Sequence, residues 1–189
     1  MIDCQLCYRP AAMPRWIRAI DALDEWVGRG VSWLTVAMAA IGAFNAIARY
    51  LGRFVGVNLS SNVYLELQWY LFSLVFLLGA GWCLGRNAHV RVDVLYARLD
   101  ERAQAWIDVV GTLVLLVPFT VVGLWVSWPA VRNSWAVREV SSDPGGLVRY
   151  PLKAMILVSL ALVLLQGIAE LGKRVVRLRE LAAAGRTRS

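Results

Sequence analysis

Residues 106–128 read WIDVVGTLVLLVPFTVVGLWVSW, an apolar run with one charged residue, Asp108. At about 1.5 Å per helical residue the run covers about 33 Å, enough to cross a hydrocarbon core of about 30 Å. Its end residues, Trp106 and Trp128, are spaced to lie in the aromatic belts at the two faces of a bilayer. Ordinary packing of large aromatic side chains is the alternative for this pair. The run predicts a membrane-spanning helix.

Three further stretches have the same character, so we expect four spans: about 27–48, 69–84, 106–128 and 154–172. Hydrophobic residues make up 59% of the 189 residues, more than a water-soluble domain of this size requires. The predicted fold class is therefore an all-α membrane protein with four transmembrane helices and amphipathic interfacial helices. We expect one membrane domain over residues 1–189.

The net charge of +7 would suggest nucleic acid in a soluble protein, but here the basic residues lie in loops and tails. Most of them precede span one, separate spans two and three, or follow span four. Six lie in the other two loops: Arg49, Arg53, Arg132, Arg138, Arg149 and Lys153. Because positive charge favours the cytoplasmic side, both termini are expected there. The first 25 residues lack the continuous apolar region of a signal peptide, so span one is expected to be an uncleaved anchor.

The segments outside the spans have their own patterns. Residues 1–15 are expected to be a tail, and apolar positions from Trp16 to Val27 predict an amphipathic lead-in at the membrane surface or running into span one. Residues 85–105 predict a cytoplasmic interfacial segment, read as a short helix although Val90–Val94 also alternates like a strand. A basic tail follows from residue 173 to 189. Pro118 is expected to bend span three.

Few residues in the chain suggest catalysis. Zinc would need two ligands besides Cys4 and Cys7, and a membrane cytochrome would need a second histidine besides His89. We therefore expect no catalytic residues, no cofactor, no metal and no enzyme activity. We also expect the chain to lack buried charge, since snorkelling and capping explain four charged residues near span ends: Glu66, Asp108, Lys153 and Glu170. Asn45 and Gln166, within spans, are expected to hydrogen-bond to a neighbouring helix.

Three runs in the second quarter of the chain carry a family resemblance. They are ELQWYLF at 66–72, FLLGA at 76–80 and RNAHVRVD at 86–93, followed by Ser134-Trp135, Glu139, Ser141 and Lys153 around the start of span four. This pattern resembles the small membrane subunit (DctQ type) of tripartite ATP-independent periplasmic (TRAP) transporters. The four-span layout matches over residues from about 20 to 175.

The resemblance implies a function and partners. It implies a small permease subunit of a sodium-coupled, binding-protein-dependent transporter for organic acids in the bacterial inner membrane. The implied partners are a large membrane subunit, which carries the sodium and substrate sites, and a periplasmic binding protein. The small subunit would enlarge the static scaffold of the large one and help to dock the binding protein. The lipid bilayer is the third partner, and no nucleic acid is expected.

Two sets of residues are candidates for contacts. The first set is expected to contact the large subunit or to fix a structural turn: Glu66, Gln68, Trp69, Arg86, Asn87, His89, Arg91 and Asp93. The turn expected from Arg86 to Asp93 is the cytoplasmic one. On a helix, Arg86, His89 and Asp93 would share one face. The second set could dock the binding protein or only contact lipid phosphates: Arg49, Arg53, Arg132, Arg138 and Arg149.

Two other functions remain open from the residues alone. One is an independent four-span channel or membrane assembly factor. The other is the anchor subunit of a membrane oxidoreductase, which the single histidine makes weaker.

Overall fold

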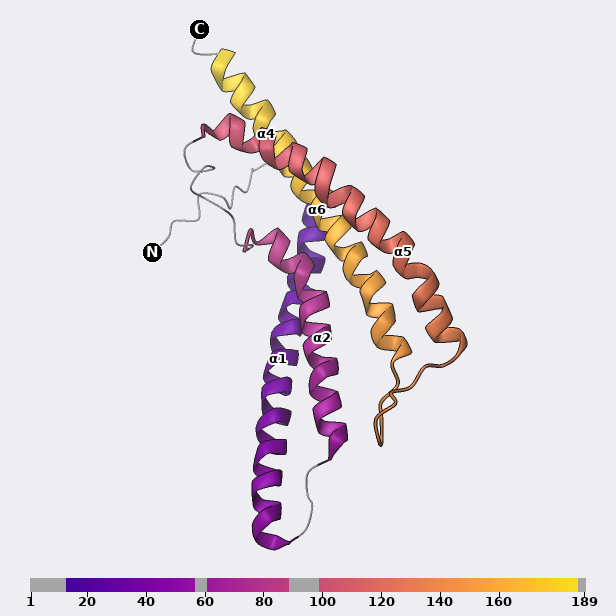
Figure 1. Ribbon diagram of the computed structural model, residues 1–189. Coiled ribbons are helices and arrows are strands. Elements are labelled where there is room, and N and C mark those ends of the chain that lie inside the picture. Colours follow the sequence, from indigo (N-terminus) through magenta and orange to yellow (C-terminus); the bar gives the residue numbers. More distant parts are fainter. Residues whose placement is uncertain (1–12, 57–60, 89–98, 187–189) are drawn as a thin grey trace.

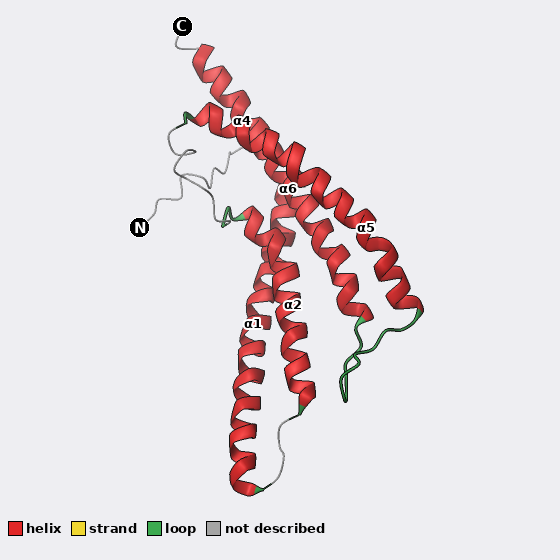
Figure 2. Cartoon of the chain, in the orientation of Figure 1, coloured by secondary structure: helices red, strands yellow, loops and turns green. Residues whose placement is uncertain are grey.

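The structure is a computed structural model that describes residues 13–56, 61–88 and 99–186. Its elements are α1 (Arg15–Val55), α2 (Asn62–Gly85), α4 (Glu101–Gly111), the π-helix η1 (Thr112–Leu116), α5 (Val117–Ala136) and α6 (Tyr150–Arg186). The described residues contain no named strand, only an isolated antiparallel bridge between Val140 and Val148. Figure 2 shows helices joined by short loops. The predicted all-α class is confirmed.

Four helices are long and apolar enough to cross a membrane: Arg15–Phe54, Asn62–Gly85, Glu101–Ala136 and Tyr150–Ala182. The chain is a multi-pass membrane protein. Trp33, Trp69 and Trp125 are 74%, 77% and 78% exposed within the isolated chain. Lipid or a membrane partner covers such surfaces, so the bundle needs few large buried side chains of its own.

The helices form two hairpins that meet at one end (Figure 1). Helix α1 packs along α2, α2 also packs along α6, and α6 runs beside α4 and α5. The described chain ends at the top of Figure 1 and begins lower in the view, where α1 passes α6; we call this upper side of the molecule the termini end. The opposite end carries the last turns of α1, the start of α2 and the loop that joins α5 to α6, and we call it the hairpin end.

The lead-in is part of a continuous helix. Helix α1 has 41 residues, about 61 Å at 1.5 Å each, so it extends well beyond a hydrocarbon core of about 30 Å. Ile17 in its first turns is fully buried and lies against Gly172 of α6. Of the two expectations for the lead-in, the helix that runs into span one is correct, because packing on α6 holds it in the bundle.

Span three contains a local change of helix type. Helices α4, η1 and α5 form one rod from Glu101 to Ala136, and Figure 1 shows it curving beside α6. The π-helical turn ends directly before Val117-Pro118. Pro118 has no N–H to donate, and a π-turn is one way in which a helix accommodates the lost hydrogen bond. Two residues further on, the Thr120 hydroxyl donates to the carbonyls of Leu116 and Val117 at 2.9 and 3.0 Å.

Local signals set several helix ends correctly. The Ser61 hydroxyl accepts a hydrogen bond from the Val63 N–H at 3.3 Å, as a cap of α2. Helix α2 ends at Gly85, where Asn87 has a φ of 53° that turns the chain away. Pro151 lies in the first turn of α6.

Candidate functional site

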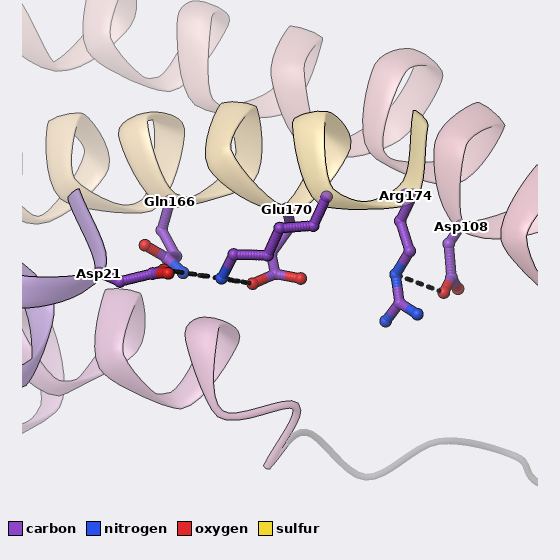
Figure 3. A network of polar contacts seen from close by, with 6 residues as sticks. Asp21, Asp108, Gln166, Glu170 and Arg174 are labelled. Atoms are coloured by element: carbon purple, nitrogen blue, oxygen red, sulfur yellow. Dashed lines mark hydrogen bonds and ion pairs between the residues drawn. The ribbon is translucent and has the colours of Figure 1, made fainter. Parts of the chain in front are cut away.

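A polar junction ties α1 to α6 near the termini end, and we define it by Asp21, Asp24, Gln166, Glu170 and Lys173. Lys173 Nζ lies 2.7 Å from both Asp21 Oδ1 and Glu170 Oε1. Gln166 Nε2 donates to the same two oxygens at 3.1 and 3.3 Å. Figure 3 shows these groups aimed at one another between the two helices. Two carboxylates, one ammonium and one amide therefore form a single network.

Asp24 sits at the edge of the polar junction, where α1, α2 and α6 meet. It is 4% exposed, and its Oδ2 has no hydrogen-bond partner within the described residues. A Cβ added at Gly81 of α2 would lie 3.2 Å from Asp24 Oδ1 and 3.4 Å from the Cβ of Leu162 on α6. Glycine at position 81 therefore lets three helices approach around a carboxyl group.

Two ion pairs extend this end of the bundle between α4 and α6. Arg174 Nε lies 3.2 Å from Asp108 Oδ2, and both side chains are about 85% buried, with 15% and 13% exposed. Arg177 Nη2 lies 2.6 Å from Glu101 Oε2 in a more exposed position. Figure 3 shows the Asp108–Arg174 pair next to the polar junction. The start of α4 is thereby fixed along α6.

A third contact joins α1 to the end of α2. Arg86 Nη2 lies 2.7 Å from Glu25 Oε2, and Trp82 Nε1 donates to the same oxygen at 3.3 Å. The Arg86 guanidinium also lies 5.0 Å from the centroid of the Trp82 ring. Arg86 is thus a helix–helix contact.

The loop between α5 and α6, residues 137–149, folds as a short hairpin pinned to α2, and we call it the 137–149 hairpin. Glu66 of α2 accepts a hydrogen bond from the Leu147 N–H at 2.8 Å. The Tyr70 hydroxyl, one turn further, donates to the Val148 carbonyl at 2.7 Å. Inside the hairpin, Ser141 N–H donates to Leu147 O and Arg149 N–H to Glu139 O, both at 2.9 Å.

The base of the 137–149 hairpin is fixed by charge. Glu139 forms an ion pair with Lys153 of α6 and accepts a hydrogen bond from Ser134 of α5 at 2.7 Å. These hydrogen bonds from Lys153 and Ser134 lower the pKa of the Glu139 carboxyl below its usual 4.5. Arg149 donates to Ser141 at 3.0 Å and lies 3.9 Å from Glu66. Three of the residues that the family resemblance singled out around span four, Ser134, Glu139 and Lys153, form one contact set.

These contacts correct two expectations. The chain does carry buried charge, since Asp24 and Glu66 are 4% and 8% exposed. Snorkelling and capping are also the wrong explanation for three charged residues near span ends, because each contacts another segment: Glu66, Asp108 and Lys153. The fourth, Glu170, contacts Gln166 and Lys173 of its own helix. Glu66 was expected to act through its own helix terminus, but the backbone of the 137–149 hairpin lies against it.

The candidate turn set divides into described and undescribed members. His89, Arg91 and Asp93, like Cys4 and Cys7, lie outside the described residues. Gln68 packs on Gly42 of α1, whose added Cβ would meet its Nε2 at 2.3 Å. Trp69 is exposed. Arg86 lies beyond the end of α2 at Gly85, and Asn87 adopts a positive φ. A shared face for Arg86, His89 and Asp93 stays a prediction, because His89 and Asp93 lie outside the described residues.

Asn45 and Gln166 were both predicted to hydrogen-bond to a neighbouring helix. For Gln166 the prediction is confirmed. Gln166 reaches Asp21 of α1, as described above. Asn45 of α1 is 3% exposed, and its Oδ1 has no hydrogen-bond partner within the described residues.

The candidate docking arginines lie at the hairpin end but differ in surroundings. Arg49, Arg53, Arg132 and Arg138 are exposed, and no ion pair to any of them occurs within the described residues. Arg149 is instead engaged inside the 137–149 hairpin. Arg138 has a φ of 46°, an unusual conformation for a residue with a Cβ, at the end of α5.

Sequence reasoning missed most of the polar junction. Asp21, Asp24 and Lys173 were assigned to an amphipathic lead-in and a basic tail. The available signal was charge. Acidic residues precede span one, basic residues follow span four, and both segments are expected on the same side of the membrane.

With the four helices and their polar contacts described, a comparison against protein families gives the family of the chain. Residues 38–177 match the family described as tripartite ATP-independent periplasmic transporters, DctQ component. The chain belongs to the DctQ family. It is thus the small membrane subunit of a TRAP transporter, and the suspected resemblance is confirmed. A search among curated proteins finds no match.

The DctQ match covers the 137–149 hairpin and most of the polar junction, but not Asp21 or Asp24, which precede residue 38. Family membership implies a large membrane subunit and a binding protein as partners in the transporter. Within the described residues, no group of three His, Cys, Asp or Glu side chains could hold a metal ion.

The 137–149 hairpin allows a prediction about pH. Because the pKa of Glu139 is lowered in the folded state, its contribution is fully present above the usual pKa of 4.5 and is lost as pH falls through the lower folded value. We expect hydrogen-exchange protection of residues 139–149 to be constant from neutral pH to about 5 and to fall only below 4.5. In Glu139→Gln, protection should be lower at neutral pH and lack this acid step. An acid step of unchanged size in the variant would assign it to another group.

Proposed function

We propose that this DctQ subunit is a static brace of a sodium-coupled, binding-protein-dependent transporter for organic acids in the bacterial inner membrane. The large subunit moves the substrate and the sodium ions, and this chain holds the large subunit in place. The supporting observation is the use of polar groups. Asp21, Gln166 and Lys173 of the polar junction bond between α1 and α6. Beside them Arg174 bonds to Asp108 of α4, and Glu66 of α2 bonds to the 137–149 hairpin.

A scaffolding role follows because these bonds oppose the sliding of one helix along another. A helix that slides along its neighbour would have to leave charges unpaired in a poorly hydrated place, which costs about 1–3 kcal/mol or more for each group. Lys173 holds α1 to α6, Arg174 holds α4 to α6, and Glu66 holds the 137–149 hairpin to α2. All four predicted spans are therefore coupled, and the bundle favours one arrangement.

The distribution of basic residues supports an orientation of the chain in which both termini face the cytoplasm. The termini end carries most of them, and the hairpin end carries the six in the two loops between spans one and two and between spans three and four. The termini end then faces the cytoplasm and the hairpin end faces the periplasm. In this orientation the 137–149 hairpin lies on the side from which a binding protein arrives.

Docking of the binding protein follows as the second part of the proposal. The 137–149 hairpin is held rigidly by α2, and it presents Val137 and Val140, 63% and 55% exposed, beside exposed Arg138. Arg49 and Arg53 lie at the same end of the bundle, on the last turns of α1. A fixed basic surface would attract an acidic face of a soluble partner and accelerate association.

Reconstitution with single omissions tests the proposal. Proteoliposomes that contain both membrane subunits should accumulate an organic acid when a sodium gradient and the binding protein are supplied. Vesicles that contain this chain alone should not, and charge reversal by Arg53→Glu with Arg138→Glu should weaken capture of the binding protein. Accumulation by this chain alone would refute the brace, and unchanged capture in the reversed variant would refute the docking role.

A further inference from the structure

A groove lies on the surface of α5 near the hairpin end. It has a volume of about 270 Å³ and is lined by five residues: Trp128, Pro129, Arg132, Asn133 and Ala136. These positions recur every three or four residues, so they form one face of the helix. Val131 and Ser134, which are 7% and 1% exposed, occupy the buried face. The groove therefore opens away from the bundle.

The polar groups in the groove are available to a ligand. Arg132 is exposed, and no ion pair to it occurs within the described residues. Asn133, on the next position of the helix, is also exposed. Trp128 is 60% exposed, and Trp125, one turn closer to the middle of the span, is 78% exposed. Two hydrogen-bond donors, Arg132 and Asn133, thus lie next to an exposed aromatic strip.

The depth of the groove decides what can fill it. Trp106 and Trp128 lie about 33 Å apart along the helix, so each lies near one boundary of a hydrocarbon core of about 30 Å. Arg132 is four residues beyond Trp128, about 6 Å further from the bilayer centre. At that depth a guanidinium meets the phosphate groups of lipids, and the strip from Trp128 to Trp125 meets the acyl chains.

We propose that this groove binds one phospholipid of the adjacent leaflet. Arg132 and Asn133 donate hydrogen bonds to the phosphate oxygens, and an acyl chain lies over Trp128 and Trp125. A soluble partner fits the groove less well, because the groove continues into the aromatic strip from Trp128 to Trp125, which runs into the hydrocarbon region. Arg132 therefore differs from Arg138, which follows the end of α5 and lies in the loop outside the membrane.

Native mass spectrometry of the purified full chain in detergent tests the proposal. The probes are phosphatidylethanolamine, phosphatidylglycerol and a galactosyl diacylglycerol that lacks phosphate, all with the same acyl chains. We expect the chain to retain one phospholipid in preference to the galactolipid. Arg132→Gln should lower that affinity about fivefold, the effect of about 1 kcal/mol for one arginine, and Trp128→Ala should also lower it. Arg138→Gln, the matched control, should leave it unchanged.

Two results would overturn the proposal. Equal retention of the galactolipid, or equal behaviour of Arg132→Gln and Arg138→Gln, would mean nonspecific lipid contact only. Release of the large subunit from the purified complex by Arg132→Gln, with lipid retention unchanged, would make the groove a protein contact. Comparing the two phospholipids shows whether net negative charge matters in addition to the phosphate. None of these readouts depends on transport, so their failure is distinct from failure of the proposed function.

Discussion

Replacing Lys173 by methionine should destabilise the isolated chain by about 2–3 kcal/mol. The ammonium neutralises Asp21 and Glu170 at once, at 2.7 Å each, and is itself 14% exposed. Its removal leaves two nearby carboxylates facing each other without a cation. Breaking a fully buried ion pair costs about 3–5 kcal/mol, and the 32% exposure of Asp21 reduces the expected loss.

The measurement is SDS-induced unfolding of the full chain in detergent, followed by circular dichroism. Arg179→Gln is the matched control, because Arg179 is an exposed cation on the same helix. The triple variant Lys173→Met, Asp21→Asn, Glu170→Gln should recover part of the loss, since it removes the unpaired charges. If Lys173→Met unfolds like Arg179→Gln, the polar junction does not hold α1 to α6.

Replacing Gly28 by alanine should destabilise the chain by about 2 kcal/mol, whereas Gly30→Ala, two residues along α1, should be neutral or slightly stabilising. A Cβ at position 28 would lie 2.4 and 2.5 Å from Cδ1 and Cγ of Trp82, where the rigid indole ring is attached to its Cβ. The ring cannot turn aside without losing its hydrogen bond to Glu25 and its contact with Arg86. Overpacking of this kind costs about 1–3 kcal/mol.

Gly30 is a stringent control, because an added Cβ there has no neighbour within 4 Å. Alanine also has the higher helix propensity, by up to about 1 kcal/mol. In the same SDS titration, Gly30→Ala should therefore be at least as stable as the wild type. Gly28→Ala should be clearly less stable than both. A Gly28→Ala protein as stable as Gly30→Ala would mean that α1 and α2 are not packed through Trp82.

The fold could be predicted because its signals are local. The run at 106–128 is long and apolar enough to require a span, Ser61 can cap only the helix that follows it, and Pro151 favours a first helical turn. The curvature at Pro118 was also predictable from the missing N–H. The π-turn that accommodates it was not, because several local changes of helix type would satisfy the same lost bond.

The candidate site was less predictable because its contacts are distant in sequence. Asp21 and Lys173 are 152 positions apart, and Glu66 meets Leu147 across 81. Each of these charges had a sufficient local explanation, such as a helix terminus for Glu66 or a basic tail for Lys173. Which helix ends lie next to each other can be told only once the tilt and order of the helices are known. The family resemblance found Glu66, Glu139 and Lys153 without giving a reason for them, and the 137–149 hairpin supplies it.

The central claim is that this bundle keeps one arrangement while its partner transports. Spin labels at Phe72 of α2 and Phe119 of α5, both exposed, report the separation of the two helical hairpins by pulsed electron paramagnetic resonance. The labels require a background without Cys4, Cys7 and Cys83. In the assembled transporter, the distance distribution should be the same without sodium, with sodium, and with binding protein and organic acid. A shift of about 5 Å, one helical turn, between these states would contradict the brace.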